Sequence, residues 1–193
     1  MRATTLVPRH PDLAEVLITS TRIRRRIRRL AAEIRGVMGE DEFTMISLIN
    51  GAVMFTADLM REFDNPVRLD CIRVASCGGD TRAQGTPRIV EHLTLDLRDR
   101  RVLLVDDILD TGRTLHLVRE LVRQLQPATL HTCVLLDKRA RRAIEIEADF
   151  VGFRIPNRFV VGYGLDFAER YRNLPCIGVL KKSRLRTGRP SCG

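Results

Sequence analysis

The chain has 193 residues and a formal net charge of +9, with 44% hydrophobic and 30% charged residues. This size and composition fit one soluble globular domain that can bury a core. No apolar run approaches the roughly 20 residues of a membrane-spanning helix, and the first residues lack a secretory signal, which predicts a cytoplasmic protein without a membrane partner. The five cysteines show no CxxC spacing, so neither a zinc site nor a disulfide framework is expected.

The N-terminal part of the chain contains a dense basic stretch. Residues 1–18 show no regular pattern and are predicted to be irregular. In residues 21–36, TRIRRRIRRLAAEIRG, apolar residues recur at helical spacing and arginines fill most other positions. This pattern predicts a surface helix over about 20–36 with a solvated basic face; an anionic partner or a subunit contact is the alternative. No aromatic residue is interleaved there, which argues against binding of single-stranded nucleic acid.

The rest of the chain alternates between strand and helix patterns. Strands are predicted at residues 44–49, 67–75, near 89–93, at 101–105, 129–137, within 150–156, within 159–164 and at 176–180. Helices are predicted from just after Asn50-Gly51 to about Arg61 and from about Thr114 to Leu125. Such alternation is typical of an α/β fold with a mostly parallel sheet. The basic tail 183–193 is predicted to be flexible.

Several polar segments fall at the predicted carboxyl end of the sheet. Ligands of open α/β sheets bind beyond this end of the strands. The rule brings together Asn50-Gly51, the glycine-rich loop 77–88, the segment 106–114 and Lys138. The loop is long enough to be functional or mobile. We therefore expect the functional site along this rim.

The segment VLLVDDILDTGRTL, residues 102–115, places three carboxylates within five residues at the end of an apolar strand. Carboxylates this close repel one another, and the cost rises as they lose water, so a ligand should use them. The following DTGRT lies where a helix is predicted to begin, and its backbone N–H groups, glycine and threonine hydroxyls can cradle a phosphate. Helix capping is the alternative role for Asp110 or Thr111. Asp106 and Asp107 suit ribose hydroxyls or a magnesium ion, which predicts a ribose 5-phosphate site.

The same segment resembles the phosphoribosyl-diphosphate (PRPP) signature of the type I phosphoribosyltransferases. The stretches LINGAVMFTADLMR, LDKRARR and DFVGFRIPNRFVVGYGLDFAERYRNLPCIGVLK resemble the hypoxanthine-guanine branch of that family in order and spacing. The resemblance covers roughly residues 13–182. It implies a phosphoribosyltransferase domain over residues 19–182, in which helices flank a mostly parallel central sheet and terminal segments build a small hood.

The resemblance also implies residues that bind PRPP. Asp106 and Asp107 would hold the ribose hydroxyls directly or through Mg²⁺, and Asp166 would lie near the diphosphate magnesium and the purine edge. The 5-phosphate would be held by Asp110, Thr111, Gly112, Arg113 and Thr114, and the diphosphate by Asn50, Gly51 and Arg172. The family often has a cis peptide in the Asn50-Gly51 loop. Asp110 would also be the general acid/base, since the purine must lose a proton as it bonds to the sugar.

On the purine side, the resemblance implies three further residues. Lys138 would donate to the 6-oxo group, Phe159 would stack on the base, and Val160 would supply main-chain contacts. A lysine can only donate, which favours an oxo base over the amino group of adenine. Read alone, Lys138 could be a surface lysine and Phe159 a core residue.

Two positions depart from the family pattern. Asn50 stands where the family has a lysine, so one positive charge is missing from the diphosphate loop. Ser76-Cys77 stands where the lid loop has Ser-Tyr. Closure of that lid would exclude water from the reacting sugar. Cys77 has no evident base partner, so a nucleophilic role for it is not expected.

The activity implied by the resemblance is purine salvage: transfer of a 5-phosphoribosyl group from PRPP to N9 of hypoxanthine or guanine, giving IMP or GMP and pyrophosphate. A xanthine-preferring transferase is one alternative. A PRPP-sensing regulator that binds nucleic acid is another, kept open by the net charge of +9. The family forms dimers and tetramers, so a homodimer or homotetramer is expected, and nucleic acid is not an expected partner.

Overall fold

The computed structural model describes residues 10–76 and 87–185, and its centre is a six-stranded sheet of order β4-β3-β2-β5-β6-β7. Neighbouring strands are parallel except for β3 and β4, which are antiparallel. The strands are β2 (Phe43–Ile49), β3 (Val67–Ser76), β4 (Pro87–Glu91), β5 (Arg101–Leu109), β6 (Thr129–Asp137) and β7 (Phe150–Arg154). The predicted α/β class with a mostly parallel sheet is therefore confirmed.

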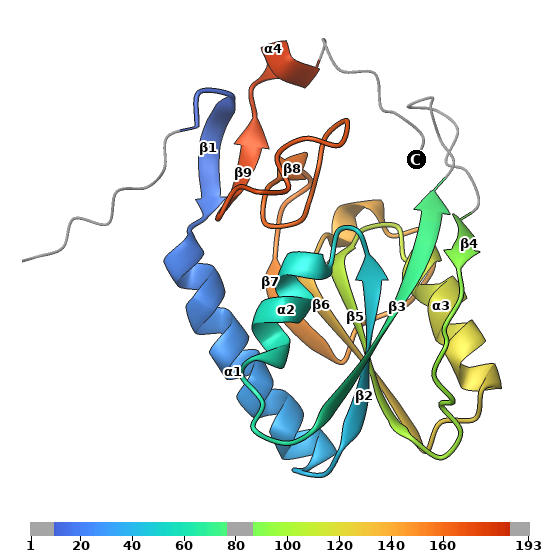
Figure 1. The fold of residues 1–193 in the computed structure, drawn as a ribbon. Coiled ribbons are helices and arrows are strands. Elements are labelled where there is room, and N and C mark those ends of the chain that lie inside the picture. The colour runs from blue at the N-terminus through green and yellow to red at the C-terminus, as the bar shows by residue number, and fades with distance from the viewer. Residues whose placement is uncertain (1–9, 77–86, 186–193) are drawn as a thin grey trace, which may run out of the picture.

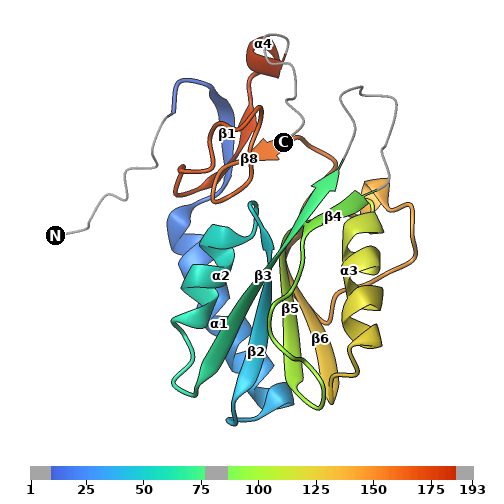
Figure 2. The same cartoon turned by 45° about the vertical axis from the view of Figure 1, so that its right-hand side comes forward.

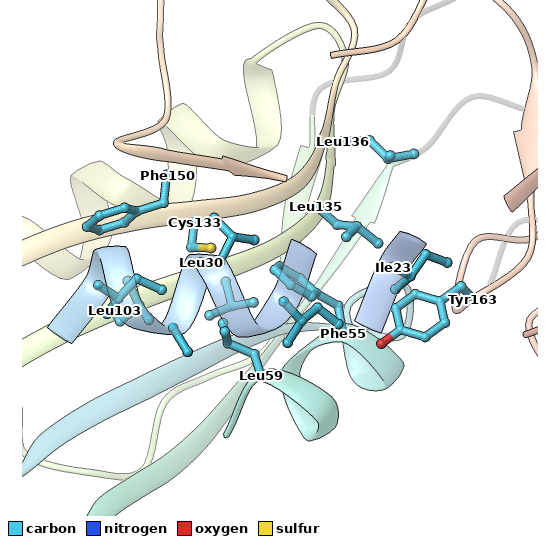
Figure 3. Close-up of a cluster of buried hydrophobic side chains, with 14 of the residues drawn as sticks. Ile23, Leu30, Phe55, Leu59, Leu103, Cys133, Leu135, Leu136, Phe150 and Tyr163 are labelled. Carbon is cyan, nitrogen blue, oxygen red and sulfur yellow. The ribbon is translucent and has the colours of Figure 1, made fainter. Parts of the chain in front are cut away.

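Helices cover both faces of this sheet. α1 (Ser20–Met38) and α2 (Val53–Met60) lie on one face, and α3 (Arg113–Gln124) lies on the other (Figure 2). Each helical layer covers its own cluster of buried apolar side chains, and Figure 3 shows part of the cluster under α1 and α2. Burial on both faces explains why the central strands are continuous apolar runs in the sequence.

The arginine-rich helix α1 forms as its spacing predicts. Its apolar positions are buried, among them Ile23, Ile27, Leu30, Ala31 and Ile34. Its exposed arginines are Arg22, Arg24, Arg25, Arg28 and Arg29. Arg26 differs, because it donates to the carbonyl oxygens of Val151 and Gly152 at 2.8 and 2.9 Å. One arginine of the basic run therefore fixes α1 to strand β7.

A second sheet lies over the carboxyl ends of the central strands (Figure 1). Its three strands are antiparallel in the order β1-β9-β8. They are β1 (Leu13–Ile18), β8 (Val160–Val161) and β9 (Ile177–Leu180). This sheet is the hood that the resemblance implied.

The prediction of irregular structure over residues 1–18 is wrong for Leu13–Ile18, which form β1. Only Leu13 and Ile18 of this strand are buried, so no alternating pattern marks it in the sequence. The strand forms because it pairs with β9 near the other end of the chain. Residues Leu13–Ile18, which precede the predicted start of the domain at residue 19, therefore form one strand of the hood.

Two short helices were not predicted, η1 (Arg139–Arg141) after β6 and α4 (Lys182–Leu185) after β9. The expectation of a flexible segment from residue 183 onward is therefore wrong up to Leu185. Arg184 of α4 donates to Oδ1 of Asp12 at 2.7 Å. This contact joins segments far apart in the sequence, so no local sequence pattern predicts it. In the part of the chain that the structure describes, no helix has the length and apolar character needed to cross a membrane.

Candidate active site

Strand β5 continues past the predicted end at residue 105 and carries Asp106 and Asp107 on the strand itself. The apolar run stops at Val105, but backbone pairing with β6 does not depend on side-chain type and continues to Leu109. Asp106 is only 6% exposed, and its Oδ1 accepts a hydrogen bond from the N–H of Asp107 at 2.9 Å. The two carboxyl groups thus lie at the carboxyl end of a central strand, beneath the hood.

The Asp106–Asp107 pair is electrostatically unfavourable in the free protein. Burial raises the pKa of Asp106 well above its ordinary value, and the adjacent charge of Asp107 raises it further. Burial also raises the pKa of Asp107, although its hydrogen bond with Asp106 and the positive charge of Arg172 act in the opposite direction. A ligand that brings hydroxyl donors or positive charge to this pair would offset its cost.

The loop between β2 and α2 packs directly on Asp107. Its Ile49–Asn50 peptide bond is cis, as the resemblance implied. A Cβ on Gly51 would lie 1.9 Å from Oδ2 of Asp107, so only glycine fits there. From above, Gly164 of the hood approaches so closely that a Cβ on it would lie 2.0 Å from the carbonyl oxygen of Gly51. This first loop is therefore held between β5 and the hood.

The DTGRT segment turns from β5 into α3. Gly112 has a φ of +84°, and a Cβ on it would lie 2.7 Å from Cγ2 of Ile146, so glycine is needed for both reasons. The helix begins at Arg113, and Gly112 offers no side chain to cap it. The hydroxyl of Thr111 lies 3.5 Å from the backbone N of Arg113, which is a long hydrogen bond. The first turn of α3, including Thr114, follows directly, and its role as a phosphate cradle stays a prediction.

Asp110 follows β5 and meets the end of β6 through ion pairs. Its Oδ2 lies 3.0 Å from Nζ of Lys138 and 3.2 Å from Nη1 of Arg141. Its Oδ1 is buried without a hydrogen-bond partner among the described residues. The side chain of Lys138 is only 7% exposed, so the surface-lysine alternative is wrong. A ligand that donates a hydrogen bond would satisfy Oδ1.

Arg142 and Asp137 were not singled out from the sequence, yet they hold this corner together. Nη2 of Arg142 lies 2.5 Å from Oδ1 of the buried Asp137. Arg142 also donates to the carbonyl oxygens of Asp110 at 3.2 Å, of Leu109 at 3.3 Å, and of Ile146. The available signal was an acidic residue that ends an apolar strand just before the basic run KRARR.

The hood supplies the remaining predicted residues. Val160 is buried in β8, whereas Phe159 is 45% exposed and contacts Phe167 edge to face, with ring centroids 5.5 Å apart. Phe159 is thus not a core residue, and its ring is free to stack on a base. Nη2 of Arg172 lies 3.0 Å from Oδ1 of Asp166, which pairs these two residues within the hood.

The structure describes only the two ends of the lid loop, Ser76 just before it and residues 87–88, which begin β4. Ser76 ends β3. Cys77 lies outside the described residues, as does most of the predicted loop 77–88. The lid roles of Ser76 and Cys77 stay predictions.

The predicted magnesium ligands do not form a complete protein site. Within residues 10–76 and 87–185, no group of three or more His, Cys, Asp and Glu side chains is placed to hold a metal ion. Mg²⁺ at Asp106, Asp107 or Asp166 would therefore need further oxygen ligands from a substrate. A diphosphate with a ribose diol can supply them.

Comparison with protein families and sequences gives a consistent result. A model of the phosphoribosyl transferase domain matches residues 17–168. The hypoxanthine-guanine phosphoribosyltransferase of Aquifex aeolicus is 43% identical over 162 residues, covering 83% of this chain and 91% of that protein. That of Bacillus subtilis is 42% identical over 171 residues, covering 88% and 94%. The bifunctional protein TilS/HprT of Listeria monocytogenes is 41% identical over 89% of this chain, which spans only 26% of that longer protein.

Solved structures agree with the sequence matches. A hypoxanthine phosphoribosyltransferase from Staphylococcus aureus has a TM-score of 0.84 and 39% identity, covering 91% of this chain and 95% of its own. The Trypanosoma cruzi hypoxanthine phosphoribosyltransferase has a TM-score of 0.85 and 36% identity, covering 92% and 96%. With the family model matching most of its length, this chain belongs to the phosphoribosyltransferase family.

Proposed function

We propose that this protein is a hypoxanthine-guanine phosphoribosyltransferase of purine salvage, which makes IMP or GMP and pyrophosphate from PRPP and a purine base. Identities of 42% and 43% to enzymes of that name, over most of both chains, support this assignment. The observation that supports the purine side is the corner beside the buried Lys138, where Oδ1 of Asp110 has no hydrogen-bond partner among residues 10–76 and 87–185. A relative from Trypanosoma cruzi, 35% identical with a TM-score of 0.83, has been solved with the product IMP.

In the proposed reaction, Asp110 is the proton acceptor. N9 of the base bonds to C1 of the ribose while the bond from C1 to the diphosphate oxygen breaks, and its electron pair leaves with pyrophosphate. The proton that the purine loses from N7 passes to Asp110. Lys138 donates to the 6-oxo group, Phe159 stacks on the ring, and Val160 contributes main-chain contacts.

The phosphate side of the site holds PRPP at three points. Asp106 and Asp107 accept the ribose hydroxyls, which relieves their buried repulsion. The 5-phosphate lies in the cradle of residues 110–114, where helix N–H groups face it. The diphosphate meets the main chain at Asn50 and Gly51 and the guanidinium of Arg172. The lid that follows Ser76 closes over these groups and excludes water.

Mg²⁺ fits this site as an ion shared with PRPP. The carboxylates of Asp106, Asp107 and Asp166 are hard oxygen ligands of the kind that the ion prefers, and they would hold it together with oxygens of PRPP. When bound, the ion neutralises charge on the departing pyrophosphate.

Assembly and location follow the same proposal. A cytoplasmic homodimer or homotetramer is expected, without membrane or nucleic-acid partners. Support for self-association comes from exposed apolar side chains near the β4 edge of the central sheet, Leu69 of β3 at 45% and Val90 of the edge strand β4 at 55%.

The alternatives are less favoured. A PRPP-sensing regulator does not need a purine pocket, whereas this chain buries Lys138 beside Asp110. A xanthine-preferring transferase would use the same lysine, since xanthine shares the 6-oxo group, but the relatives at about 40% identity bear the hypoxanthine-guanine name.

One assay tests the proposal with hypoxanthine, guanine, xanthine and adenine in parallel, each with PRPP and Mg²⁺. We expect transfer to hypoxanthine and guanine and little to adenine. Asp110→Asn should lower kcat by roughly 10²- to 10⁴-fold and leave PRPP binding largely intact. Wild-type turnover of that variant would remove Asp110 from its role. No transfer to any base, together with salt-dependent nucleic-acid binding, would favour the regulator.

A further inference from the structure

We infer that Tyr163 is a positioning residue for PRPP: its hydrogen bond to Asp58 of α2 holds the hood turn that aligns both the first loop and Arg172. The inference rests on the proposed function, because it names a determinant of the diphosphate side of that same site. Tyr163 is not expected to touch substrate.

The hood turn around Tyr163 has an unusual backbone. Gly162 and Gly164 have φ values of +101° and +99°, and Tyr163 between them has a φ of +53°. Positive φ is uncommon for a residue as large as tyrosine, so surrounding contacts must hold it there. The turn is tightly packed, because a Cβ on Gly162 would lie only 2.1 Å from the carbonyl oxygen of Cys176.

Tyr163 connects this turn to the layer of α1 and α2. Its ring belongs to the apolar cluster that includes Ile23 of α1 and Phe55 of α2, and Figure 3 shows it at the edge of that cluster. Its hydroxyl donates to Oδ2 of Asp58 at 2.6 Å and lies 3.5 Å from the carbonyl oxygen of Met54. The other oxygen of Asp58 pairs with Arg61 at 2.9 Å. Asp58 thus accepts hydrogen bonds from Tyr163 and from Arg61 at the end of its own helix.

The hydroxyl remains a donor under ordinary conditions. Burial raises the pKa of Tyr163 far above its usual value, and the hydrogen bond and charge of Asp58 raise it further. A short bond from a hydroxyl to a carboxylate is stronger than a neutral one. The Tyr163–Asp58 contact is therefore a firm link between the hood and α2.

Two contacts carry this link into the site. Gly164, the next residue, rests on the carbonyl oxygen of Gly51, and Gly51 in turn rests on the carboxylate of Asp107. The carbonyl oxygen of Gly164 also accepts a hydrogen bond from Nη1 of Arg172 at 2.8 Å. The same turn therefore positions both groups that are proposed to contact the diphosphate. These groups are the first loop and the guanidinium of Arg172.

The purine side depends less on this turn. Lys138 and Asp110 follow β6 and β5 and pair with each other, while Val160 is held by pairing with Val179 of β9. Loosening the turn should therefore weaken PRPP more than the base. This difference distinguishes positioning from a general loss of structure.

The test is Tyr163→Phe, which removes only the hydroxyl and keeps the ring in the core. We expect KM for PRPP to rise about fivefold to tenfold, within the worth of a hydrogen bond to a charged group, with kcat and KM for hypoxanthine within about twofold. The dissociation constant for PRPP with Mg²⁺, measured by calorimetry, should rise by the same factor. Asp58→Asn should act in the same direction, and the double variant should be no worse than Tyr163→Phe alone.

Tyr171→Phe is the matched control. Tyr171 is the other tyrosine of the chain, lies in the same hood and also has a positive φ of +76°. Its hydroxyl donates to Oδ2 of Asp12 at 3.0 Å, away from the first loop, although it neighbours Arg172 in sequence. This variant should keep the wild-type KM for PRPP.

Wild-type kinetics and PRPP affinity in Tyr163→Phe would overturn the inference. Equal effects of Tyr163→Phe and Tyr171→Phe would also overturn it, as would a rise in KM for hypoxanthine equal to the rise in KM for PRPP. Failure of the proposed function looks different: the wild-type protein would transfer phosphoribosyl to no purine. The calorimetric comparison of PRPP affinity would still test Tyr163 in that case.

Discussion

Asp106 and Asp107 occupy adjacent positions on a buried strand, where two carboxylates disfavour each other. A protein selected for stability alone would replace one of them with a neutral residue. Asp106 accepts a hydrogen bond from the N–H of Asp107, and an asparagine could accept the same bond without the charge. The two carboxylates are therefore better explained by the proposed binding of PRPP than by the needs of the fold.

Asp106→Asn should stabilise the free protein and weaken PRPP binding. Removing a buried, repelled charge should raise the free energy of unfolding by roughly 1–3 kcal/mol at neutral pH. Burial raises the pKa of Asp106 in the folded state above its ordinary value of 3.8. The wild type therefore loses stability as the pH rises from 3.8 to the pKa of the folded state. The advantage of the variant should therefore be largest at neutral pH and shrink as pH falls. Denaturant unfolding at several pH values measures it, and a variant less stable than wild type at neutral pH would contradict the argument.

Asn50 is the residue at which this chain departs most clearly from its family pattern. Its side chain is exposed in the first loop, so a longer residue can be accommodated. Asn50→Lys should lower KM for PRPP by roughly three- to tenfold, since an added positive charge faces the diphosphate. The gain should diminish with added salt. Asn50→Gln is the control for length without charge, and an unchanged KM in the lysine variant would mean that main-chain groups suffice.

Residues with proposed chemical roles could be recognised in the sequence more readily than the residues that position them. Asp110 and Lys138 stand in recognisable local patterns, whereas Arg142 lies in a run of basic residues that look alike. Only the folded chain distinguishes Arg142, which reaches Asp137 and three carbonyl oxygens, from its exposed neighbours. Tyr163 was hidden for the same reason, because its partner Asp58 is distant in sequence.

At the scale of helices and strands, an element could be predicted from the sequence where burial of its apolar side chains stabilises it. It could not be predicted where backbone pairing alone defines it. Strand β6 was predicted with its observed ends, Thr129–Asp137, because its apolar run coincides with its pairing. Strand β5 runs past its apolar residues, since β6 pairs with its backbone to Leu109. Strand β1 was missed altogether, because only pairing with β9 defines it. Local periodicity therefore reports buried elements well and edge elements poorly.

The turn from β5 to α3 is an element that depends on Arg142. Arg142→Lys keeps a charge but cannot reach the carboxylate of Asp137 and the carbonyl oxygens of Asp110 and Leu109 together. We expect a loss of about 2–4 kcal/mol in the free energy of unfolding and a higher KM for PRPP, because the cradle loses its support. Denaturant unfolding and PRPP kinetics measure the two effects.

Arg139→Gln is the control for that variant. Arg139 also pairs with Asp137, at 3.2 Å, but its side chain is 56% exposed. Solvent screens such a pair, so its removal should change stability little. Equal losses in Arg139→Gln and Arg142→Lys would mean that the bonds of Arg142 to the cradle carbonyls add nothing beyond an ordinary contact with Asp137.

At the scale of the whole molecule, the proposed site lies between two bodies, the central sheet with its helices and the hood, and Val160, Tyr163 and Ile177 of the hood join the apolar cluster under α1 and α2. The central sheet supplies the carboxylates, the cradle and Lys138, while the hood supplies Phe159, Val160, Asp166 and Arg172. The hood has its own small apolar cluster, formed by Leu13, Val161, Leu174, Cys176 and Leu180. Neither body alone carries a complete set of the proposed site residues, so activity should depend on the seating of the hood.

Leu13→Ala tests this dependence from the far edge of the hood. Leu13 packs on Gly178 of β9: a Cβ on Gly178 would lie 2.6 Å from Cδ1 of Leu13. Strand β9 in turn pairs with Val160 of β8. Truncating this buried leucine should cost about 2–3 kcal/mol in the free energy of unfolding and raise KM for the purine, because β8 and the adjoining Phe159 lose their backing. Leu97→Ala, in the cluster under α3, should cost at least as much stability yet leave KM for the purine unchanged. Parallel changes in both variants would indicate that purine binding follows global stability, whereas a change confined to Leu13→Ala ties it to the hood.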